Sequence, residues 1–511
     1  MTYNKRQPFT EEWQKYEKGK EYNRSIGLYG EVDTNERFYR GDQWVGVASS
    51  GLPTPVFNFY RRVIDYYVSA LSASAVTMSY AYASPVPRLT PEQQNRVNGV
   101  LQKITAFRWE KLKMDRLLTD SLFDAAITGD AFAYTYWDPS VRTGQPYTGD
   151  FRTVLTDNTN VFFGNPNSRA VQSQPYIIIS MREPVCDLRA EAEKNGIDKE
   201  RIALIVPDSD TEYFSGDMAE KELENTKCVS LIYLWKEDGR VHYRKSVRGT
   251  VITDDTDTGL SLYPVAYYSW SKVKNSWHGR AVGTGMVDNQ IFINKAYAMV
   301  MKHMMDTAFS KVVYDSTVID EWTNRVGEAI AVNGPVENVA RVLSGGSMQS
   351  GMLDVINMAI GHTKDFLGAT DSALGTEKAD NTSAIIALQQ ASSQPLENVR
   401  RSLYQFVEDI GLIWLDFMFA FYDDKRLMRV QSESGSDFIE FPFSEYRSAL
   451  FDCAVEVGDT GWWSEVTAVN TLDGLLKLGK ISAAQYLERL PENIIPRKKE
   501  LIESLSQTEE K

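Results

Sequence analysis

The sequence predicts an α+β protein with several sub-structures rather than one compact domain. Strand-like runs, rich in aromatic and β-branched residues, recur between residues 131 and 247, whereas apolar residues after residue 285 mostly follow the three- and four-residue spacing of helices. At 511 residues the chain also exceeds the size at which a single hydrophobic core stops growing. Hydrophobic residues make up 43% of the chain, which is ample material for these cores.

The first half of the chain predicts helices that give way to strands. A charged helix is expected over residues 10–24 with Thr10 as its cap, a second over about 58–71, and a third from Met114 to Ile127. A short helix is expected near 185–195. The expected strands cover residues 131–137, 160–166, 175–181, 229–235 and 241–247.

A long helix is predicted from Gly285 to Ala308, because no Gly or Pro interrupts the chain after Gly285; it would extend roughly 36 Å. Asp288, Lys295 and Lys302 are one heptad apart and form a narrow polar stripe, while methionines and other apolar residues cover most of the remaining surface. Such a helix must pack on several neighbours. Two interpretations of Lys295 and Lys302 are open. They lie on an ordinary solvated face of the helix, or they form part of a charged ring that faces a central passage.

Residues 309–347 predict a small unit of short strands with a helical turn, in which Trp322, Val326 and Ile330 form an apolar set. A second helix over 348–367 follows, and then a polar connection that contains Glu377 and Lys378.

The longest predicted helix runs from Ala384 to Tyr422, roughly 58 Å, with a kink at Pro395. The tail from about residue 463 is expected to be helical, and Ser482 with Gln485 matches a capping box.

Charge and cysteine content exclude several classes of protein. A formal net charge of -14 argues against a protein that grips nucleic acid by neutralising its phosphates. Cys186, Cys228 and Cys453 are far apart, so they predict neither a disulfide framework nor a zinc site. The polar start lacks a signal-peptide core, and the apolar stretch 411–422 is too short to span a membrane.

No catalytic signature emerges, and the sequence predicts no catalytic residue, metal or cofactor. The P-loop, H-E-x-x-H, G-x-S-x-G and paired Cys/His patterns are all missing, and the glycines of 279–285 have the wrong spacing for a dinucleotide loop. His242, His278, His303 and His362 occur singly. Carboxylates at Asp254, Asp255 and Asp257 could ligate calcium, but the other ligands of a calcium loop are missing, so a solvated hairpin is the simpler interpretation.

Several stretches, in this order and spacing, resemble the portal proteins of tailed bacteriophages over about residues 35–422. They are FYRGDQW with LPTPVFNFYRRVIDYYVSAL, ITGDAFAYTYWD, NVFFGNP, WHGRAVGTGMVDNQIFINK and NTSAIIALQQASSQPLENVRRSLYQF. The resemblance implies a portal fold with an α/β wing, a two-helix stem, a small α/β clip, a long kinked helix and a helical C-terminal crown. The implied boundaries are 1–279 for the first part of the wing, 280–308 for stem helix 1, 309–347 for the clip, 348–369 for stem helix 2, 370–381 for the tunnel loop, 382–462 for the long kinked helix and second part of the wing, and 463–511 for the crown.

The resemblance also implies a function without catalysis. Such a chain forms a dodecameric ring at one capsid vertex, made in the cytoplasm of the bacterial host, through which double-stranded DNA passes non-specifically during packaging and ejection. Its partners are further copies of itself, the terminase motor, the head-completion or adaptor and tail proteins, and the capsid and scaffolding proteins; no membrane is involved. Lys295, Lys302, Lys378 and Glu377 would line the channel, and Trp322, Val326 and Ile330 would dock partners at the clip.

Two alternatives stay open at the level of sequence. A different virion structural protein, such as a capsid or head-completion component, would equally lack catalytic residues. An acid-rich hydrolase would need two carboxylates in one pocket, and 69 acidic residues leave room for such a pair.

Overall fold

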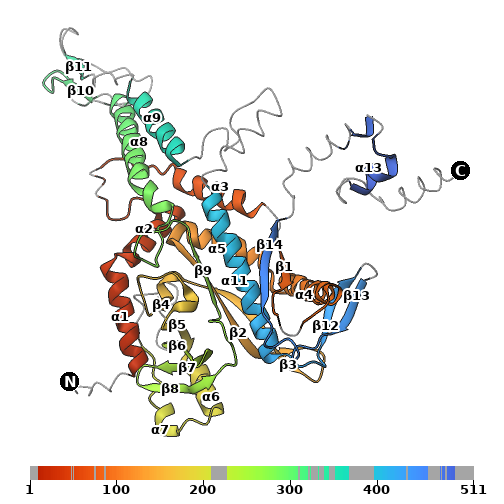
Figure 1. Ribbon diagram of the computed structural model, residues 1–511. Coiled ribbons are helices and arrows are strands. Elements are labelled where there is room, and N and C mark those ends of the chain that lie inside the picture. The colour runs from red at the N-terminus through yellow and green to blue at the C-terminus, as the bar shows by residue number, and fades with distance from the viewer. Residues whose placement is uncertain are drawn as a thin grey trace. The chain divides into compact units, whose positions relative to one another are not determined.

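The protein mixes helices and sheets, and its chain divides into two compact units (Figure 1). The computed structural model describes residues 10–47, 49, 51–73, 76–85, 88–208, 227–308, 311–319, 321, 323, 332, 339–343, 351–367, 396–432, 435–457, 472, 475–477 and 480–489. Unit 1 comprises residues 1–33, 64–282 and 379–511, and unit 2 comprises residues 34–63 and 283–378. The α+β class predicted from the sequence is therefore confirmed.

Helices dominate the first part of the chain. They are α1 Glu11–Ser25, α2 Leu28–Arg40, α3 Phe59–Ser72, α4 Pro91–Leu112 and α5 Met114–Thr128. Thr90 and Gln93 form a capping box at the start of α4, with Pro91 at its first position. Thr10 precedes α1 as predicted, but its side chain makes no capping hydrogen bond.

One sheet of unit 1 has three antiparallel strands in the order β3-β2-β9. The strands are β2 Asp130–Arg142, β3 Thr148–Thr156 and β9 Val265–Ser269. Helix α11 Glu397–Phe421 runs along this sheet (Figure 1), and its Trp414 donates a 2.8 Å hydrogen bond from the indole nitrogen to Thr153 Oγ1. Twelve buried residues of α11 make this packing a main part of the core of unit 1.

The second sheet of unit 1 has five antiparallel strands in sequence order. They are β4 Val161–Phe163, β5 Tyr176–Pro184, β6 Lys227–Glu237, β7 Arg240–Val247 and β8 Thr250–Asp257. Neighbouring residues of a strand point to opposite faces. Accordingly Val229 packs with Trp13 and Tyr16 of α1 on one face, while Cys228 packs on the other face with α6 Val185–Lys194 and α7 Lys199–Ile202.

The chain returns to strands after α11. β12 Leu427–Ser432 pairs with β13 Gly435–Glu440, and β14 Phe451–Val457 pairs with β1 Val76–Tyr82. The short helix α13 Ala483–Arg489 carries the predicted capping box, because Ser482 and Gln485 bond each other's backbone amides at 3.2 Å.

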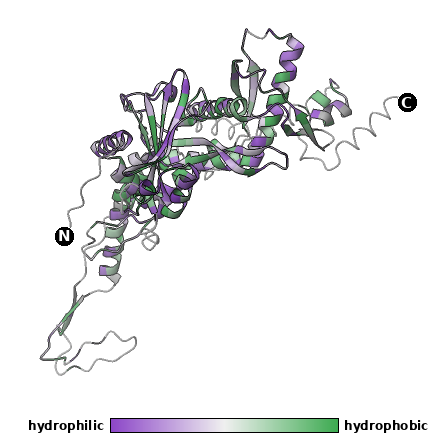
Figure 2. Cartoon of the chain, turned by 90° about the horizontal axis from the view of Figure 1, so that it is seen from below, coloured by the Kyte–Doolittle hydropathy of each residue, from purple (hydrophilic) through white to green (hydrophobic). Residues whose placement is uncertain are grey.

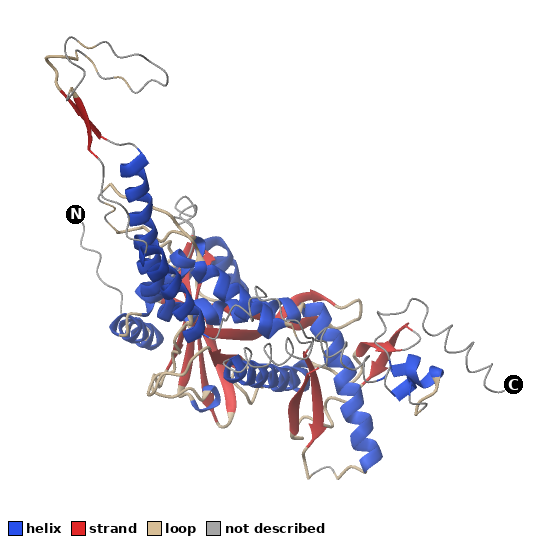
Figure 3. Ribbon diagram, turned by 90° about the horizontal axis from the view of Figure 1, so that it is seen from above, coloured by secondary structure: helices blue, strands red, loops and turns tan. Residues whose placement is uncertain are grey.

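Unit 2 is built on two helices with a pair of short strands between them in the chain. After a 3₁₀ turn at Gly283–Met286 come α8 Val287–Ala308, β10 Lys311–Tyr314, β11 Ala340–Leu343 and α9 Gly351–Leu367. The strands pair antiparallel near the end of α8 (Figures 1 and 3). The predicted order of helix, small strand-containing insert and helix is confirmed for the part of unit 2 that the structure describes.

Several elements were not predicted, and some predictions concern residues that lie outside the described part of the chain. Helix α4 and strands β1, β3, β9 and β12–β14 were not predicted. Residues 254–257 are exposed and belong to β8, which forms an antiparallel hairpin with β7, so the solvated hairpin predicted there is confirmed. The predicted helix from residue 384 is described only from Leu396, so Pro395 and its kink lie outside the described residues, as do most of 466–478. Trp322, Val326, Ile330, Glu377 and Lys378 lie outside them as well.

Candidate functional site

The helices α8 and α9 of unit 2 pack against each other along a short apolar seam. Ala296 and Val300 of α8 are buried with Ile356 of α9, and Tyr297 and Ile360 are partly buried against them. The seam residues are spaced by four, at positions 296 and 300 of α8 and 356 and 360 of α9, so the seam lies on one side of each helix.

The same helices expose an unusual number of large apolar side chains, which we call the stem surface. Hydrophobic residues recur along the whole length of α8 (Figure 2). The stem surface consists of Phe292, Met299, Met301, Met304, Met305, Leu353, Val355 and Met358, each 39–59% exposed. Apolar residues clustered in this way on a surface usually mark a protein–protein contact.

A buried chain of side-chain amides fixes the start of α8 to the preceding segment of unit 2. Gln290 Oε1 accepts a 3.0 Å hydrogen bond from the backbone amide of Tyr60, and Gln290 Nε2 donates to the Phe57 carbonyl at 2.9 Å. The same nitrogen lies 2.9 Å from Asn294 Oδ1, so Gln290 satisfies three partners.

The network continues from α8 to the loop after α2. Asn294 Nδ2 donates to Gln43 Oε1 at 2.6 Å, and Gln43 Nε2 donates to Asn58 Oδ1 at 3.1 Å. Gln43, Gln290 and Asn294 are each no more than 3% exposed. Buried amides satisfied on both sides hold one arrangement of the backbone, so this network sets the position of α8 within unit 2.

The two lysines predicted to line a channel lie on α8. Lys295 is exposed, one residue after Asn294 of the amide network. Lys302 is partly exposed, and its Nζ lies 3.0 Å from Asp306 Oδ1 one turn later. An exposed pair of this kind contributes less than about 1 kcal/mol, so Lys302 is readily available to another anion.

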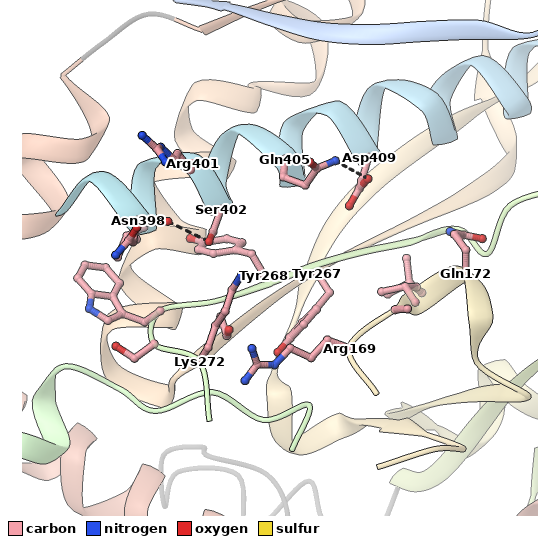
Figure 4. Close-up of a pocket in the computed structure, with 17 residues that line it drawn as sticks. Arg169, Gln172, Tyr267, Tyr268, Lys272, Asn398, Arg401, Ser402, Gln405 and Asp409 are labelled. Atoms are coloured by element: carbon pink, nitrogen blue, oxygen red, sulfur yellow. Dashed lines mark hydrogen bonds between the residues drawn. The ribbon is translucent and has the colours of Figure 1, made fainter. Parts of the chain in front are cut away.

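Unit 1 contains a polar groove of about 1000 Å³ between α11 and β9, shown in Figure 4. One wall is the side of α11 that carries Asn398, Arg401, Ser402, Gln405 and Asp409; the other wall is formed by residues 169–172 and 265–272. Burial raises the pKa of Asp409 to about 6, although the Gln405 amide lies 3.4 Å from its carboxylate. Among the described lining residues Asp409 is the only carboxylate, so this groove lacks the acid pair that a two-carboxylate hydrolase requires.

A second groove of unit 1, about 970 Å³, lies between the two sheets, and we call it the sheet groove. Lys245 is one of the residues that line it, and its Nζ lies 2.8 Å from Glu191 Oε2 and 3.0 Å from Glu183 Oε2. Burial favours the neutral amine, but the two carboxylates outweigh it, and the pKa of Lys245 is raised. Glu183 contacts both Lys245 and the Ser230 hydroxyl. Asp157 is the other carboxylate among the described residues that line the groove.

His278 is a buried structural residue. Its Nδ1 lies 2.8 Å from Asp130 Oδ2, its Nε2 lies 3.1 Å from Asn23 Oδ1, and its ring stacks on Trp277. Both nitrogens are therefore engaged within the core of unit 1.

Close packing accounts for two glycines of the 279–285 run. A Cβ on Gly279 would collide with Ser269 Cβ, and one on Gly283 would collide with the Tyr60 hydroxyl. These glycines are required by neighbouring side chains in their own units.

The acidic run on β8 is neutralised by arginines of β7. Asp255 accepts two hydrogen bonds from Arg244, at 2.5 and 2.9 Å, and Asp257 accepts one from Arg240 at 2.9 Å. The described part of the chain contains no group of three or more His, Cys, Asp or Glu residues placed to hold a metal ion.

Sequence reasoning placed Lys295 and Lys302 on the correct helix but missed the amide network and the Lys245 cluster. Gln290 and Asn294 are four residues apart and lie off the polar stripe of Asp288, Lys295 and Lys302, and this spacing was the available signal. No local pattern marks Lys245, whose partners come from residues 54 and 62 positions away.

The stem surface indicates a protein that packs against other chains. The family model for phage P22-like portal proteins matches residues 198–459, just over half of the sequence, and the chain belongs to this family. The matched region contains α8, α9 and α11 and continues beyond residue 422, the expected end of the resemblance, through β12–β14. A search of curated proteins finds no match.

Family membership confirms the class of protein predicted from the sequence. The chain is a bacteriophage portal protein and a component of the virion, and the family is structural and non-enzymatic. Portal proteins of this family form oligomeric rings that associate with the capsid. None of the described helices is long and apolar enough to cross a membrane.

Proposed function

We propose that the chain forms a dodecameric ring at one capsid vertex and that the ring is the channel through which viral DNA is packaged and ejected. In this proposal α8 and α9 are the two stem helices, and residues 309–347 are the clip. Residues 1–279 and 382–462 form the wing, 370–381 the tunnel loop and 463–511 the crown.

The observation that carries the proposal is the stem surface. Exposing eight large apolar side chains on two helices is unfavourable in water, and a neighbouring subunit placed against each helix pair would remove them from solvent. A closed ring gives every subunit the same two neighbours and leaves no stem surface uncovered. Methionine is suited to this contact, because its flexible thioether side chain repacks at low energetic cost when subunits shift.

The negative net charge of the chain supports free passage of DNA through the proposed channel. With a formal net charge of -14 the chain offers few phosphate contacts, so duplex DNA of any sequence can slide in both directions. Lys295 and Lys302, both on α8, are proposed to line the channel. Lys378 and Glu377, which lie outside the described residues, are proposed to line it at the tunnel loop.

Partner proteins are proposed to dock at the clip through Trp322, Val326 and Ile330. The terminase motor binds there during packaging and hydrolyses the ATP. Head-completion, adaptor and tail proteins follow, and capsid and scaffolding proteins surround the ring. The portal subunit itself has no catalytic role or cofactor in this scheme and is made in the cytoplasm of the bacterial host before it enters the capsid.

The ring is tested by placing charge on the stem surface. In the double variant Met304→Glu, Met305→Glu, two carboxylates would have to be desolvated at each subunit contact, so rings should be lost at micromolar concentration in mass photometry and negative-stain images. The matched control is Lys295→Ser on the same helix, which should still form rings.

Two outcomes would contradict the proposal. If the wild-type chain is a monodisperse monomer, the stem surface does not drive assembly. If the double glutamate variant forms rings as readily as the wild type, the contact between subunits lies elsewhere.

A further inference from the structure

Strand β9 is an edge strand of the three-stranded sheet in unit 1, and among the described strands it pairs only with β2. The Thr135 amide of β2 donates a 2.9 Å hydrogen bond to the Pro264 carbonyl just before β9. At the other end the Trp270 amide donates one of 2.9 Å to the Gly129 carbonyl. Because backbone groups alternate along an antiparallel strand, the even-numbered residues from 264 to 270 face β2, and the odd-numbered residues from 263 to 271 face away from it.

Both ends of this outward-facing edge have hydrogen-bond partners. The side-chain amide of Gln172 pairs with Tyr263 as a neighbouring strand would. Its Nε2 donates to the Tyr263 carbonyl at 3.1 Å, and its Oε1 accepts from the Tyr263 amide at 2.8 Å. At the opposite end the Arg280 amide donates a 2.9 Å bond to the Ser271 carbonyl.

Between these two ends, three residues have outward-facing backbone groups without a hydrogen-bond partner among the described residues. They are Val265, Tyr267 and Ser269, and each is no more than 9% exposed. More than about nine tenths of the buried backbone N–H and C=O groups in proteins are hydrogen-bonded, so this stretch is unusual. An unpaired strand edge is a template to which another strand can add.

The polar groove between α11 and β9 runs along this edge (Figure 4). Residues 265 and 267–269 line one side of it, and the polar side of α11 lines the other. Its volume of about 1000 Å³ is at the upper end of the range for binding pockets, roughly 300–1000 Å³. The groove is therefore large enough to hold a short extended peptide beside β9.

Cationic side chains outnumber carboxylates on the groove walls. Arg169, Lys272 and Arg401 line it, against Asp409 alone among the described residues. Arg169 donates to two backbone carbonyls, at 2.6 and 3.1 Å, which do not neutralise its charge. Arg401 lies 3.6 Å from Glu397 in an exposed pair, which holds it only weakly. Lys272 and Arg401 lie toward one end of the groove and Asp409 toward the other (Figure 4), so one end is basic.

We infer that this groove binds an extended acidic segment of a different protein, which adds to the free edge of β9 as a further strand and places its carboxylates beside Lys272 and Arg401. Main-chain hydrogen bonds supply affinity in this mode of binding, and side chains supply specificity. All described strands of this chain are already paired within it, which favours a different protein as the source of the added strand. The inference concerns unit 1 alone and does not depend on ring formation.

A defined peptide tests the inference on the full chain. The probe is a fluorescent seven-residue peptide of alternating glutamate and threonine, because threonine favours extended structure. In fluorescence anisotropy it should bind saturably with a Kd below about 1 mM. Two matched peptides should bind at least tenfold more weakly. One has lysine in place of glutamate, and the other is methylated on its backbone nitrogens and cannot donate hydrogen bonds to β9.

Two matched variants test the basic end of the groove. Lys272→Glu should weaken binding of the glutamate peptide at least fivefold, because it reverses a charge beside the proposed carboxylates. Lys274→Glu is the control, since Lys274 is also exposed but does not line the groove. Both changes lie on the surface, so folding should be unaffected. Equal binding by the two variants would overturn the inference, as would equal binding of the glutamate and lysine peptides or no saturable binding up to about 1 mM.

Hydrogen exchange resolved to single residues tests whether the peptide pairs with the strand. Saturating glutamate peptide should slow exchange of the amides of Val265, Tyr267 and Ser269, and should leave those of Ala266 and Tyr268 unchanged, because these two already face β2. Unchanged exchange at the three outward amides would show that the peptide does not add to the sheet. If these amides exchange as slowly as those of Ala266 and Tyr268 before peptide is added, a segment of the portal protein itself occupies the edge, and the inference is wrong.

Discussion

Replacing Gln290 by Leu should release the start of α8 from the segment of unit 2 that precedes it. Leucine has a similar volume, so the change removes three hydrogen bonds without leaving a large cavity. The Tyr60 amide and Asn294 Oδ1 would lose this partner at positions that are 0 and 2% exposed. The Phe57 carbonyl belongs to a half-exposed residue and can turn to water.

The expected loss of stability follows from the two buried polar groups that lose a partner, the Tyr60 amide and Asn294 Oδ1. Each buried polar group left without its partner costs about 1–3 kcal/mol, so the local free energy of opening should fall by about 3 kcal/mol. Since each 1.4 kcal/mol corresponds to a factor of ten, hydrogen exchange at the Tyr60 amide should accelerate by roughly 100-fold.

Native-state hydrogen exchange followed by mass spectrometry measures this on peptides that span residues 57–63. Asn289→Leu is the matched control, because Asn289 is the preceding residue of α8 and its side chain is exposed. All samples should be compared in the same oligomeric state. An exchange rate in Gln290→Leu within about threefold of the wild type would refute the reasoning that the amide network holds α8 in place.

Two further predictions concern packing and pH. Gly283→Ala should lower the free energy of unfolding by about 1–3 kcal/mol in thermal unfolding, because its Cβ would collide with the Tyr60 hydroxyl. The control is Gly285→Ala, whose Cβ would meet nothing within 4 Å and should leave stability unchanged. Equal effects of the two variants would contradict the close contact between Gly283 and Tyr60. Asp409 has a pKa of about 6, above its unfolded value, so its ionised form destabilises the fold as pH rises from about 4 to 6. Asp409→Asn should therefore raise the free energy of unfolding by at most about 3 kcal/mol at pH 7.5 in denaturant titrations, and this gain should vanish near pH 4. An equal gain at both pH values would exclude ionisation of Asp409 as its cause.

The elements predicted best are those whose sequence pattern is local and uninterrupted. The helix now seen as α8 was predicted because 22 residues contain no Gly or Pro, and the strand β2 because small and aromatic residues alternate. Capping at Ser482 was predicted because a capping box is a four-residue pattern. In each case the information lies within a few residues of the element.

Other elements were missed because their stability comes from distant partners or because local signals were overlooked. Helix α4 is rich in Gln, Asn and Lys, so its apolar stripe is thin, although Thr90 and Gln93 offered a capping signal. Strand β1 pairs with β14 across about 375 residues, and no local pattern specifies such a partner. The arginine partners of the β8 carboxylates depend likewise on strand register, which a hairpin prediction does not give.

The two units differ in how their long helices are stabilised. Helix α11 of unit 1 buries twelve residues, including Phe406 and Trp414, within its own chain. Helix α8 of unit 2 buries Ile293, Ala296, Ala298 and Val300, while Phe292 and four methionines of the same helix are exposed. Burial of apolar surface is the main favourable term in folding. Helix α11 gains it within one subunit, and in the proposed ring α8 gains much of it against a neighbouring subunit. In the proposed ring the stability of α8 is therefore coupled to assembly by mass action, whereas α11 is stabilised by burial within its own chain.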